Sequence, residues 1–157
     1  MSQPLIHGAL EVISFLVGTW WGEGKGEYPT IDPFTYEEEI RFWHDGRPFL
    51  FYEQRNWNSE SKAPMHSESG FWRPREDGAI EVVLAHGFGV AEIEEGHVHG
   101  RRFELRSRSL ASTSTAKVIR EVTRTYEVDG DVLTYQMAMA YGDTPLNHHL
   151  RAELRRT

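Results

Sequence analysis

The sequence predicts an all-β fold, an antiparallel barrel or sandwich built mainly from hairpins, with one short helix near the N-terminus. The first observation is the recurrence of turn signals that pair glycine with an acidic residue, at Asp45-Gly46, Asp77-Gly78, Glu95-Gly96, Asp129-Gly130 and Gly142-Asp143. The second is that the segments between them are short and rich in β-branched and aromatic residues. A chain of hairpins is typical of small antiparallel barrels and sandwiches.

Length and composition limit the classes of protein. The 157 residues suit a single domain spanning 1–157, and 39% hydrophobic with 26% charged residues indicates a folded chain. Seventeen basic and 24 acidic residues give a net charge of -7, which argues against nucleic acid or an anionic membrane as partner. There is no cysteine, so any metal must be bound by histidine, carboxylate or methionine. The N-terminus lacks the pattern of a signal peptide, so we expect a cytoplasmic protein.

The elements follow in order along the chain. Leu10, Ile13 and Leu16 recur at near-helical spacing before Gly18, which predicts a short helix that could close one end of a barrel. A first strand follows it. Further strands are expected at 37–44, 49–57, 67–73, 79–85, 89–94, 101–110, 117–128, 131–140 and 148–155.

Alternation of side chains supports the strands near the C-terminus. One predicted strand places four large apolar side chains on one face: Leu133, Tyr135, Met137 and Met139. The preceding strand has a similar apolar face, which consists of Val118, Val122, Tyr126 and Val128 and is interrupted by Arg120 and Arg124. Residues 101–125 carry seven bases and two acids, so they form either a solvated strand face or a basic rim that grips the carboxylates of a ligand. We interpret Glu37-Glu38-Glu39 as a solvated edge.

A glycine-rich stretch follows the predicted helix. Glycine in a strand is unfavourable because it packs no side chain, so this strand requires either sharp bending or close approach of a flat ligand. Trp20 in this stretch is expected to close the base of the barrel, as in lipocalins and fatty-acid-binding proteins. The fixed positions of the stretch are Gly18, Trp20, Gly22, Gly24, Gly26, Tyr28, Pro29, Thr30 and Ile31.

This stretch resembles the G-x-W-x-G-x-G-x-G-x-Y-P-T-I signature of the nitrobindin family of all-β haem proteins. Later segments resemble the same family in the same order, at 62–66, 68–71, 89–96 and His149-Leu150. The resemblance implies an up-and-down barrel of about ten strands, similar to fatty-acid-binding proteins. It further implies one ferric haem b per chain, isomerisation of peroxynitrite to nitrate and binding of nitric oxide, with no catalytic group beyond the haem iron.

The iron ligand implied by the resemblance is His149, a histidine directly before a leucine on the last strand. Strict alternation instead places His148 on the apolar face with Leu150, and His149 on the polar face. A β-bulge, or a strand that starts after His149, would remove this conflict. His148, or no iron ligand in this segment, therefore remain alternatives.

Further contacts to the haem are expected from other segments. The resemblance places Met65 and His66 beside the haem pocket, although His66 could also be an ordinary loop histidine. It also makes Thr30 a hydroxyl that contacts haem, towards a propionate. Lys117 could pair with a propionate or be an exposed lysine. His97-x-His99 could hold zinc or copper, but the expected turn at Glu95-Gly96 and the lack of a third ligand favour an exposed hairpin.

The main rival function is a binding module. The same barrel could carry a fatty acid or another apolar molecule without iron, and a nitric-oxide carrier or sensor is a variant that keeps the haem. A lipid carrier has no use for a histidine ligand near the C-terminus. The expected partners are thus small molecules, and an exposed edge at Tyr28-Pro29 could also pair two copies of the chain into a homodimer.

Overall fold

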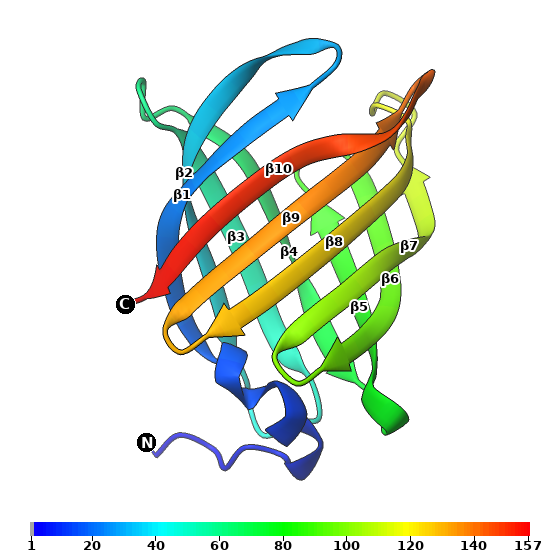
Figure 1. The fold of residues 1–157 in the computed structure, drawn as a ribbon. Coiled ribbons are helices and arrows are strands. Elements are labelled where there is room, and N and C mark those ends of the chain that lie inside the picture. The colour runs from blue at the N-terminus through cyan, green and yellow to red at the C-terminus, as the bar shows by residue number, and fades with distance from the viewer. Residues whose placement is uncertain (1) are drawn as a thin grey trace.

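The computed structural model describes residues 2–157 and shows a closed antiparallel barrel of ten strands with one 3₁₀ helix leading into it (Figure 1). Each strand pairs with its neighbours in sequence, and β1 closes the ring against β10. The predicted up-and-down barrel with a short N-terminal helix is confirmed. The elements are η1 (Gly8–Leu16), β1 (Gly18–Tyr28), β2 (Ile31–Trp43), β3 (Leu50–Asn58), β4 (Pro64–Pro74), η2 (Glu76–Gly78), β5 (Ala79–His86), β6 (Val90–His99), β7 (Arg102–Ser112), β8 (Ile119–Asp129), β9 (Val132–Tyr141) and β10 (Thr144–Arg156).

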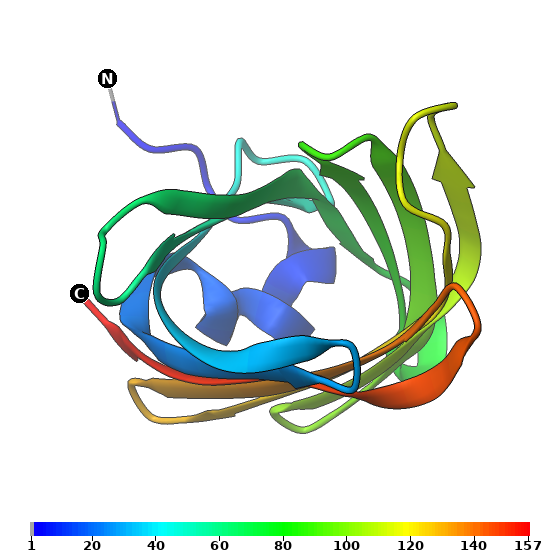
Figure 2. The same cartoon turned by 90° about the horizontal axis from the view of Figure 1, so that it is seen from above.

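Helix η1 closes one end of the barrel (Figure 2). Its apolar side chains Leu10, Ile13 and Leu16 are fully buried in the main core cluster. Trp20 is fully buried beside them, and its indole N–H donates to the Leu16 carbonyl at 2.9 Å. The Arg156 guanidinium covers the Trp20 ring at 4.2 Å. The predicted role of Trp20 in closing the base is confirmed. No helix within residues 2–157 is long and apolar enough to cross a membrane.

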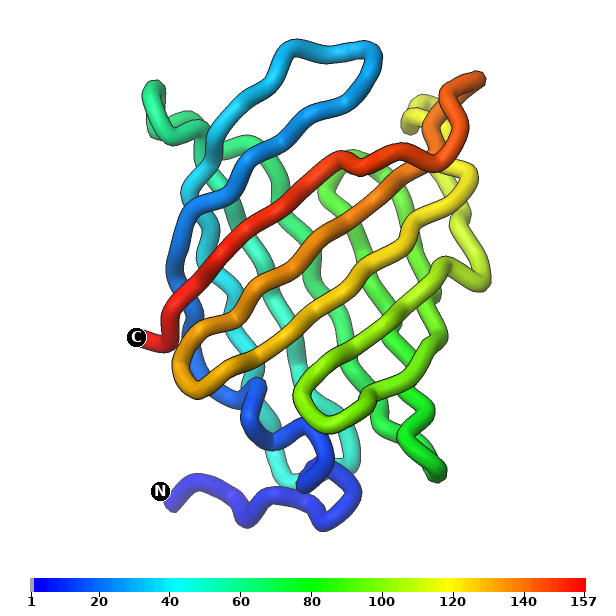
Figure 3. The backbone as a smooth tube through the Cα atoms, viewed as in Figure 1, coloured from blue at the N-terminus to red at the C-terminus, as the bar shows by residue number. Residues whose placement is uncertain are grey.

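At the opposite end of the barrel, strands β7 and β8 separate and leave a gap in the sheet (Figure 3). The ladder between these strands ends at Arg106 and Thr123, although both strands continue beyond it. Past this point β8 pairs with β9 alone, and the Ser107 hydroxyl accepts the Val122 N–H at 2.9 Å in place of a backbone partner. The end of the barrel farthest from η1 is therefore wider than the closed base.

The glycines of β1 are explained by packing inside the protein. A Cβ at Gly22 would lie 2.0 Å from the Glu153 carbonyl oxygen, and one at Gly24 would lie 2.3 Å from the Tyr36 ring. A Cβ at Gly26 would lie 2.1 Å from the Phe34 ring. The strand thus needs close approach, as predicted, but aromatic side chains of β2 occupy the space that we had considered for a flat ligand.

The turn predicted at Glu95-Gly96 is wrong, because both residues lie inside β6, and the chain turns at Gly100 instead. Gly96 serves close packing, since a Cβ there would lie 1.8 Å from the Glu104 carbonyl oxygen. His97 and His99 are exposed on one face of β6 with ring centroids 5.9 Å apart. Strands β2 and β10 also begin earlier than the predicted 37 and 148, at Ile31 and Thr144.

The basic residues of segment 101–125 lie on the solvent-exposed surface, with Arg124 as the exception. Arg102, Arg106 and Arg108 are exposed on β7 and form surface ion pairs with glutamates of neighbouring strands. Val118, which we had placed with the apolar face of β8, lies before the strand and is exposed. Arg124, which interrupts that face in the sequence, is buried inside the barrel.

Candidate functional site

An internal cavity of about 220 Å³ lies toward the end of the barrel that faces away from η1. Its wall is largely apolar and includes three methionines, with Phe34 and Leu150 beside them. The methionines are Met65, Met137 and Met139, of which the last two come from the apolar face predicted for β9. Of the residues described, three histidines also line the cavity: His66, His86 and His149.

A register shift in β10 decides which of the two adjacent histidines enters the cavity. His148 pairs with Ala138 and Leu150 pairs with Met137, so His149 is the extra residue in the ladder. An extra residue of this kind interrupts strict alternation. His149 and Leu150 both line the cavity as a result, whereas His148 does not.

The His149 ring is held in one orientation. Its Nδ1 lies 3.1 Å from the Glu27 carbonyl oxygen, which can only accept, so Nδ1 carries the proton and Nε2 has a free lone pair. The Tyr28 and Phe34 rings pack edge-on against the imidazole at centroid distances of 5.4 and 6.4 Å. Burial lowers the pKa of His149, which favours the neutral imidazole.

Deeper in the barrel, the Arg124 side chain binds three glutamates. It forms a two-pronged contact with Glu92, with Nη2 3.1 Å from Oε1 and Nε 3.2 Å from Oε2. Its Nη1 donates to Glu68 at 3.2 Å, and Glu94 lies 3.6 Å from Nε. Burial by itself would raise the pKa of Glu92, but the Arg124 charge and the hydrogen bond with His86 outweigh it and hold this pKa well below its usual range.

The pKa of Glu94 is shifted in the opposite direction. Burial, reinforced by the neighbouring Glu92 carboxylate, raises the pKa of Glu94 to about 10. At neutral pH this carboxyl group is therefore protonated. The arrangement keeps Glu92 as the carboxylate that faces both Arg124 and His86.

A second buried polar cluster joins side chains of β2 and β9. The Tyr135 hydroxyl donates to Glu38 at 2.5 Å and lies 2.7 Å from the Tyr36 hydroxyl. Glu38 is only 1% exposed, so the interpretation of 37–39 as a solvated edge is wrong for its middle residue. The reason is alternation along β2, which directs Glu38 inward between two more exposed glutamates. Burial raises the pKa of Glu38 to about 8.

Comparison with known proteins identifies the family. The model of the THAP4-like, heme-binding beta-barrel domain matches residues 9–156, which is nearly the whole chain. The chain belongs to this family. The resemblance to the nitrobindins is thereby confirmed.

Relatives of the same length support this assignment to the heme-binding barrels. A peroxynitrite isomerase of Arabidopsis thaliana is 44% identical over 97% of this chain and 91% of its own. A peroxynitrite isomerase of Nocardia farcinica is 43% identical over 98% of this chain and 95% of its own. The crystal structure of Rv2717c from M. tuberculosis superposes with a TM-score of 0.91 at 42% identity, covering 98% of this chain and 99% of that one.

The cavity residues fit the haem group that the family is named for. A metal-ligating histidine typically donates its other ring N–H to a carbonyl or carboxylate, and His149 does so to Glu27 while leaving Nε2 free. The apolar wall suits the face of a porphyrin. A cavity of about 220 Å³ encloses only part of a haem, so the rest of the ring would lie in the opening beside the unpaired part of β7 and β8. His149 would hold the iron here.

Of the four other residues predicted to contact haem, two line the cavity and two do not. Met65 and His66 line the cavity together with His149. Thr30 lies in the exposed turn between β1 and β2, outside the cavity lining. Lys117 is exposed in the loop between β7 and β8, with Nζ 5.7 Å from the centre of the Tyr141 ring. The roles of these residues toward haem remain predictions.

Sequence reasoning missed the buried charges. His86 carried no signal beyond composition, and Arg124 was noted only as an interruption of an apolar face. A usable signal existed, because Arg124 shares its strand face with Val122 and Tyr126, and a charged residue on an inward face requires a buried partner. The glutamates that pair with Arg124 lie on β4 and β6, and they could not be identified from the sequence because it does not reveal how separate strands are arranged around the barrel.

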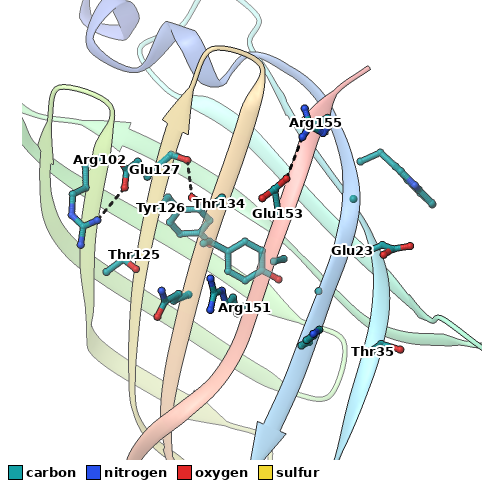
Figure 4. A pocket seen from close by; sticks show the side chains of 17 residues that line it. Glu23, Thr35, Arg102, Thr125, Tyr126, Glu127, Thr134, Arg151, Glu153 and Arg155 are labelled. Carbon is teal, nitrogen blue, oxygen red and sulfur yellow. Dashed lines mark hydrogen bonds and ion pairs between the residues drawn. The ribbon is translucent and has the colours of Figure 1, made fainter.

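A shallow depression on the outer surface is a different feature (Figure 4). It lies over the outer faces of β1, β8, β9 and β10 and is lined by charged side chains. Four of these charged side chains form ion pairs, Arg102 with Glu127 and Arg155 with Glu153. The internal cavity with its histidines is therefore the candidate functional site.

Proposed function

We propose that this protein binds one ferric haem b per chain through His149 Nε2 and isomerises peroxynitrite to nitrate. The observation that carries the proposal is the orientation of His149, whose Nδ1 faces the Glu27 carbonyl and whose ring lines the cavity. The names of the relatives from Arabidopsis thaliana and Nocardia farcinica support the activity. Haem would supply the metal centre at which peroxynitrite rearranges.

The protein's own residues would fix the cofactor and shield it. The carbonyl of Glu27 sets the His149 tautomer, so the nitrogen that faces the cavity is always the unprotonated one. Tyr28 supports this wall, because its hydroxyl donates to the Met139 carbonyl at 2.9 Å and accepts the Tyr141 N–H at 3.2 Å. The methionine and leucine side chains of the cavity wall would shield a bound haem from water.

Titration with hemin tests cofactor binding. We expect the full chain to develop a Soret band that saturates at one hemin per chain, and His149→Ala to shift the band and weaken binding. His148→Ala is the matched control and should behave like the wild type, because its side chain does not line the cavity. A spectrum unchanged in His149→Ala would remove this residue from its role. Failure of the wild type to develop the band would favour a carrier of apolar molecules without iron.

Stopped-flow kinetics test the activity. Peroxynitrite should decay faster with the hemin-loaded protein than with buffer, and nitrate should be the product. A decay rate equal to that in buffer would refute the isomerase function even if haem binds. Binding of nitric oxide to the loaded protein belongs to the same proposal and is measured by the change in the Soret band.

Two further features stay predictions. Homodimer formation through the edge at Tyr28-Pro29 is measured by sedimentation, and a monomer at all concentrations would contradict it. Cytoplasmic location is tested by fractionation of the producing cells.

A further inference from the structure

A cluster of three side chains that can bind metal lies on the cavity wall opposite His149. His66 and Glu68 share one face of β4, and Glu68 pairs directly with His86 of β5 across the ladder. One possible ligand atom from each lies within 4.8 Å of the others. Strands β4 and β5 stand across the ring from β10, so this cluster is separate from the proposed iron ligand (Figure 1).

The two imidazoles already have the spacing of two ligands of one ion. His66 Nε2 and His86 Nδ1 are 3.1 Å apart. In a tetrahedral zinc site with Zn–N distances of about 2.0–2.1 Å, two nitrogen ligands are about 3.3 Å apart. A shift of a few tenths of an ångström would therefore let an ion replace the proton that otherwise lies between the rings.

The His86 ring is oriented for this task by Glu92. Nε2 of His86 lies 2.8 Å from Glu92 Oε1, so Nε2–H donates to the carboxylate and Nδ1 keeps its lone pair toward His66. A carboxylate that accepts the second N–H of a histidine is typical of metal ligands, because it fixes the tautomer and raises the basicity of the ring. The Phe88 ring packs on both imidazoles at centroid distances of 5.2 Å.

The charge of the surroundings favours a cation. Glu68 is 6% exposed, and its Oε1 is bound to Arg124; its Oε2 lies 3.9 Å from His86 Nε2 and has no hydrogen-bond partner among residues 2–157. A buried carboxylate oxygen without a partner is unfavourable. One guanidinium faces Glu68, Glu92 and Glu94, and the proton on Glu94 neutralises only one of the three. A net negative charge therefore remains beside the histidines.

We propose that His66 Nε2, His86 Nδ1 and the Glu68 carboxylate bind a divalent transition-metal ion of the Zn²⁺ class inside the barrel. Two imidazoles and a carboxylate are a donor set that suits zinc and leaves a fourth position toward the cavity for water or a small ligand. Glu92 orients His86 from outside the coordination sphere. None of these ligands is His149, but the site shares the cavity proposed for haem, so zinc binding is tested on the chain without hemin.

Calorimetric titration of the full chain with zinc chloride tests the site. The wild type should bind one zinc ion at this site, and both His66→Ala and His86→Ala should bind it at least tenfold more weakly. Two controls locate the site. The double variant His97→Ala with His99→Ala removes the exposed histidine pair of β6, and His149→Ala removes the proposed iron ligand. Both controls should retain the wild-type affinity.

A spectroscopic measurement separates coordination from a change in stability. Cobalt(II) added in place of zinc should give the visible bands of a tetrahedral ion in the wild type, and these should be absent in His66→Gln, which keeps a polar side chain of similar length. Glu92→Gln should weaken zinc binding by about 10–100-fold. Any one of three results would overturn the proposal: no zinc binding by the wild type, wild-type zinc affinity in His66→Ala and His86→Ala, or loss of zinc binding in the β6 double variant or in His149→Ala.

Discussion

At the scale of the residue, this barrel places ionisable groups in its interior and controls each through its neighbours. Arg124 stabilises the charged forms of Glu68 and Glu92, whereas Glu38 and Glu94 are held neutral because the effect of burial outweighs the charge of Arg124. Charged groups in a barrel interior are tolerated only when they are paired or protonated. The pH dependence of stability should therefore follow these few residues.

Glu38→Gln should make the protein less sensitive to rising pH. The pKa of Glu38 is about 8 in the folded protein and its ordinary value is 4.5, so its contribution to the free energy of unfolding is complete below pH 4.5 and is lost as the pH rises to about 8. The loss should amount to a few kcal/mol, since each pKa unit corresponds to about 1.4 kcal/mol. Urea unfolding between pH 5 and 8 measures it. An equal pH slope in wild type and variant would contradict the assignment, and Glu37→Gln, at the half-buried position before it on β2, is the control.

Arg124→Met should strongly destabilise the fold. The substitution leaves Glu68 and Glu92 buried without their cation, and removing one partner of a buried ion pair typically costs about 3–5 kcal/mol. Thermal unfolding measures the effect. Arg106→Met is the control, because the Arg106 side chain is exposed and its ion pair with Glu121 lies on the surface, where such pairs contribute about 0–1 kcal/mol. Similar melting temperatures for both variants would show that the interior charges are not coupled as described.

At the scale of the element, the glycines of β1 are required by the side chains and backbone of the neighbouring strands, which leave no space for a Cβ atom. These glycines lie under the rings of Tyr36 and Phe34 and against the backbone of β10. In β10, one extra residue turns His149 toward the cavity beside Leu150. The pattern of glycines was visible in the sequence, but the side chains that occupy the space above them belong to another strand.

Gly24→Ala should destabilise the barrel by about 1–3 kcal/mol, as overpacking of a well-packed interior commonly does. The added Cβ would lie 2.3 Å from the buried Tyr36 ring, which has no room to move away. Denaturant unfolding provides the measurement. Gly8→Ala is the control, because a Cβ at Gly8 meets nothing within 4 Å. A stable Gly24→Ala variant would mean that Tyr36 can be displaced and that the glycine serves another purpose.

At the scale of the whole molecule, the barrel has two ends with different tasks. The η1 end carries Trp20 and the buried face of the helix, and its packing closes the base. The other end carries the cavity and the unpaired parts of β7 and β8. The buried side chains of η1 do not line the cavity, so stability and ligand binding can be changed separately.

Ile13→Ala tests this separation. Truncating a fully buried isoleucine should cost about 2–5 kcal/mol and lower the melting temperature. Hemin titration at a temperature where the variant is folded should give the wild-type affinity, because Ile13 packs at the base and does not line the cavity. Loss of hemin binding in a folded variant would show that the two ends are coupled. Val12→Ala, an exposed position on the same helix, is the control.

The sequence by itself determined the fold class, the helix that closes the base and the inward face of β9, because these depend on local periodicity and on turn residues. The role of Trp20 was expected from a likeness to lipocalins and fatty-acid-binding proteins, and the proposed iron ligand on the last strand from the resemblance to nitrobindins. Only the tertiary structure decided that His149 rather than His148 enters the cavity, and that His86, Glu68, Glu92 and Arg124 meet inside the barrel. The reason is that a bulge and the register between separate strands set which side chains converge, and neither leaves a periodic trace in one chain.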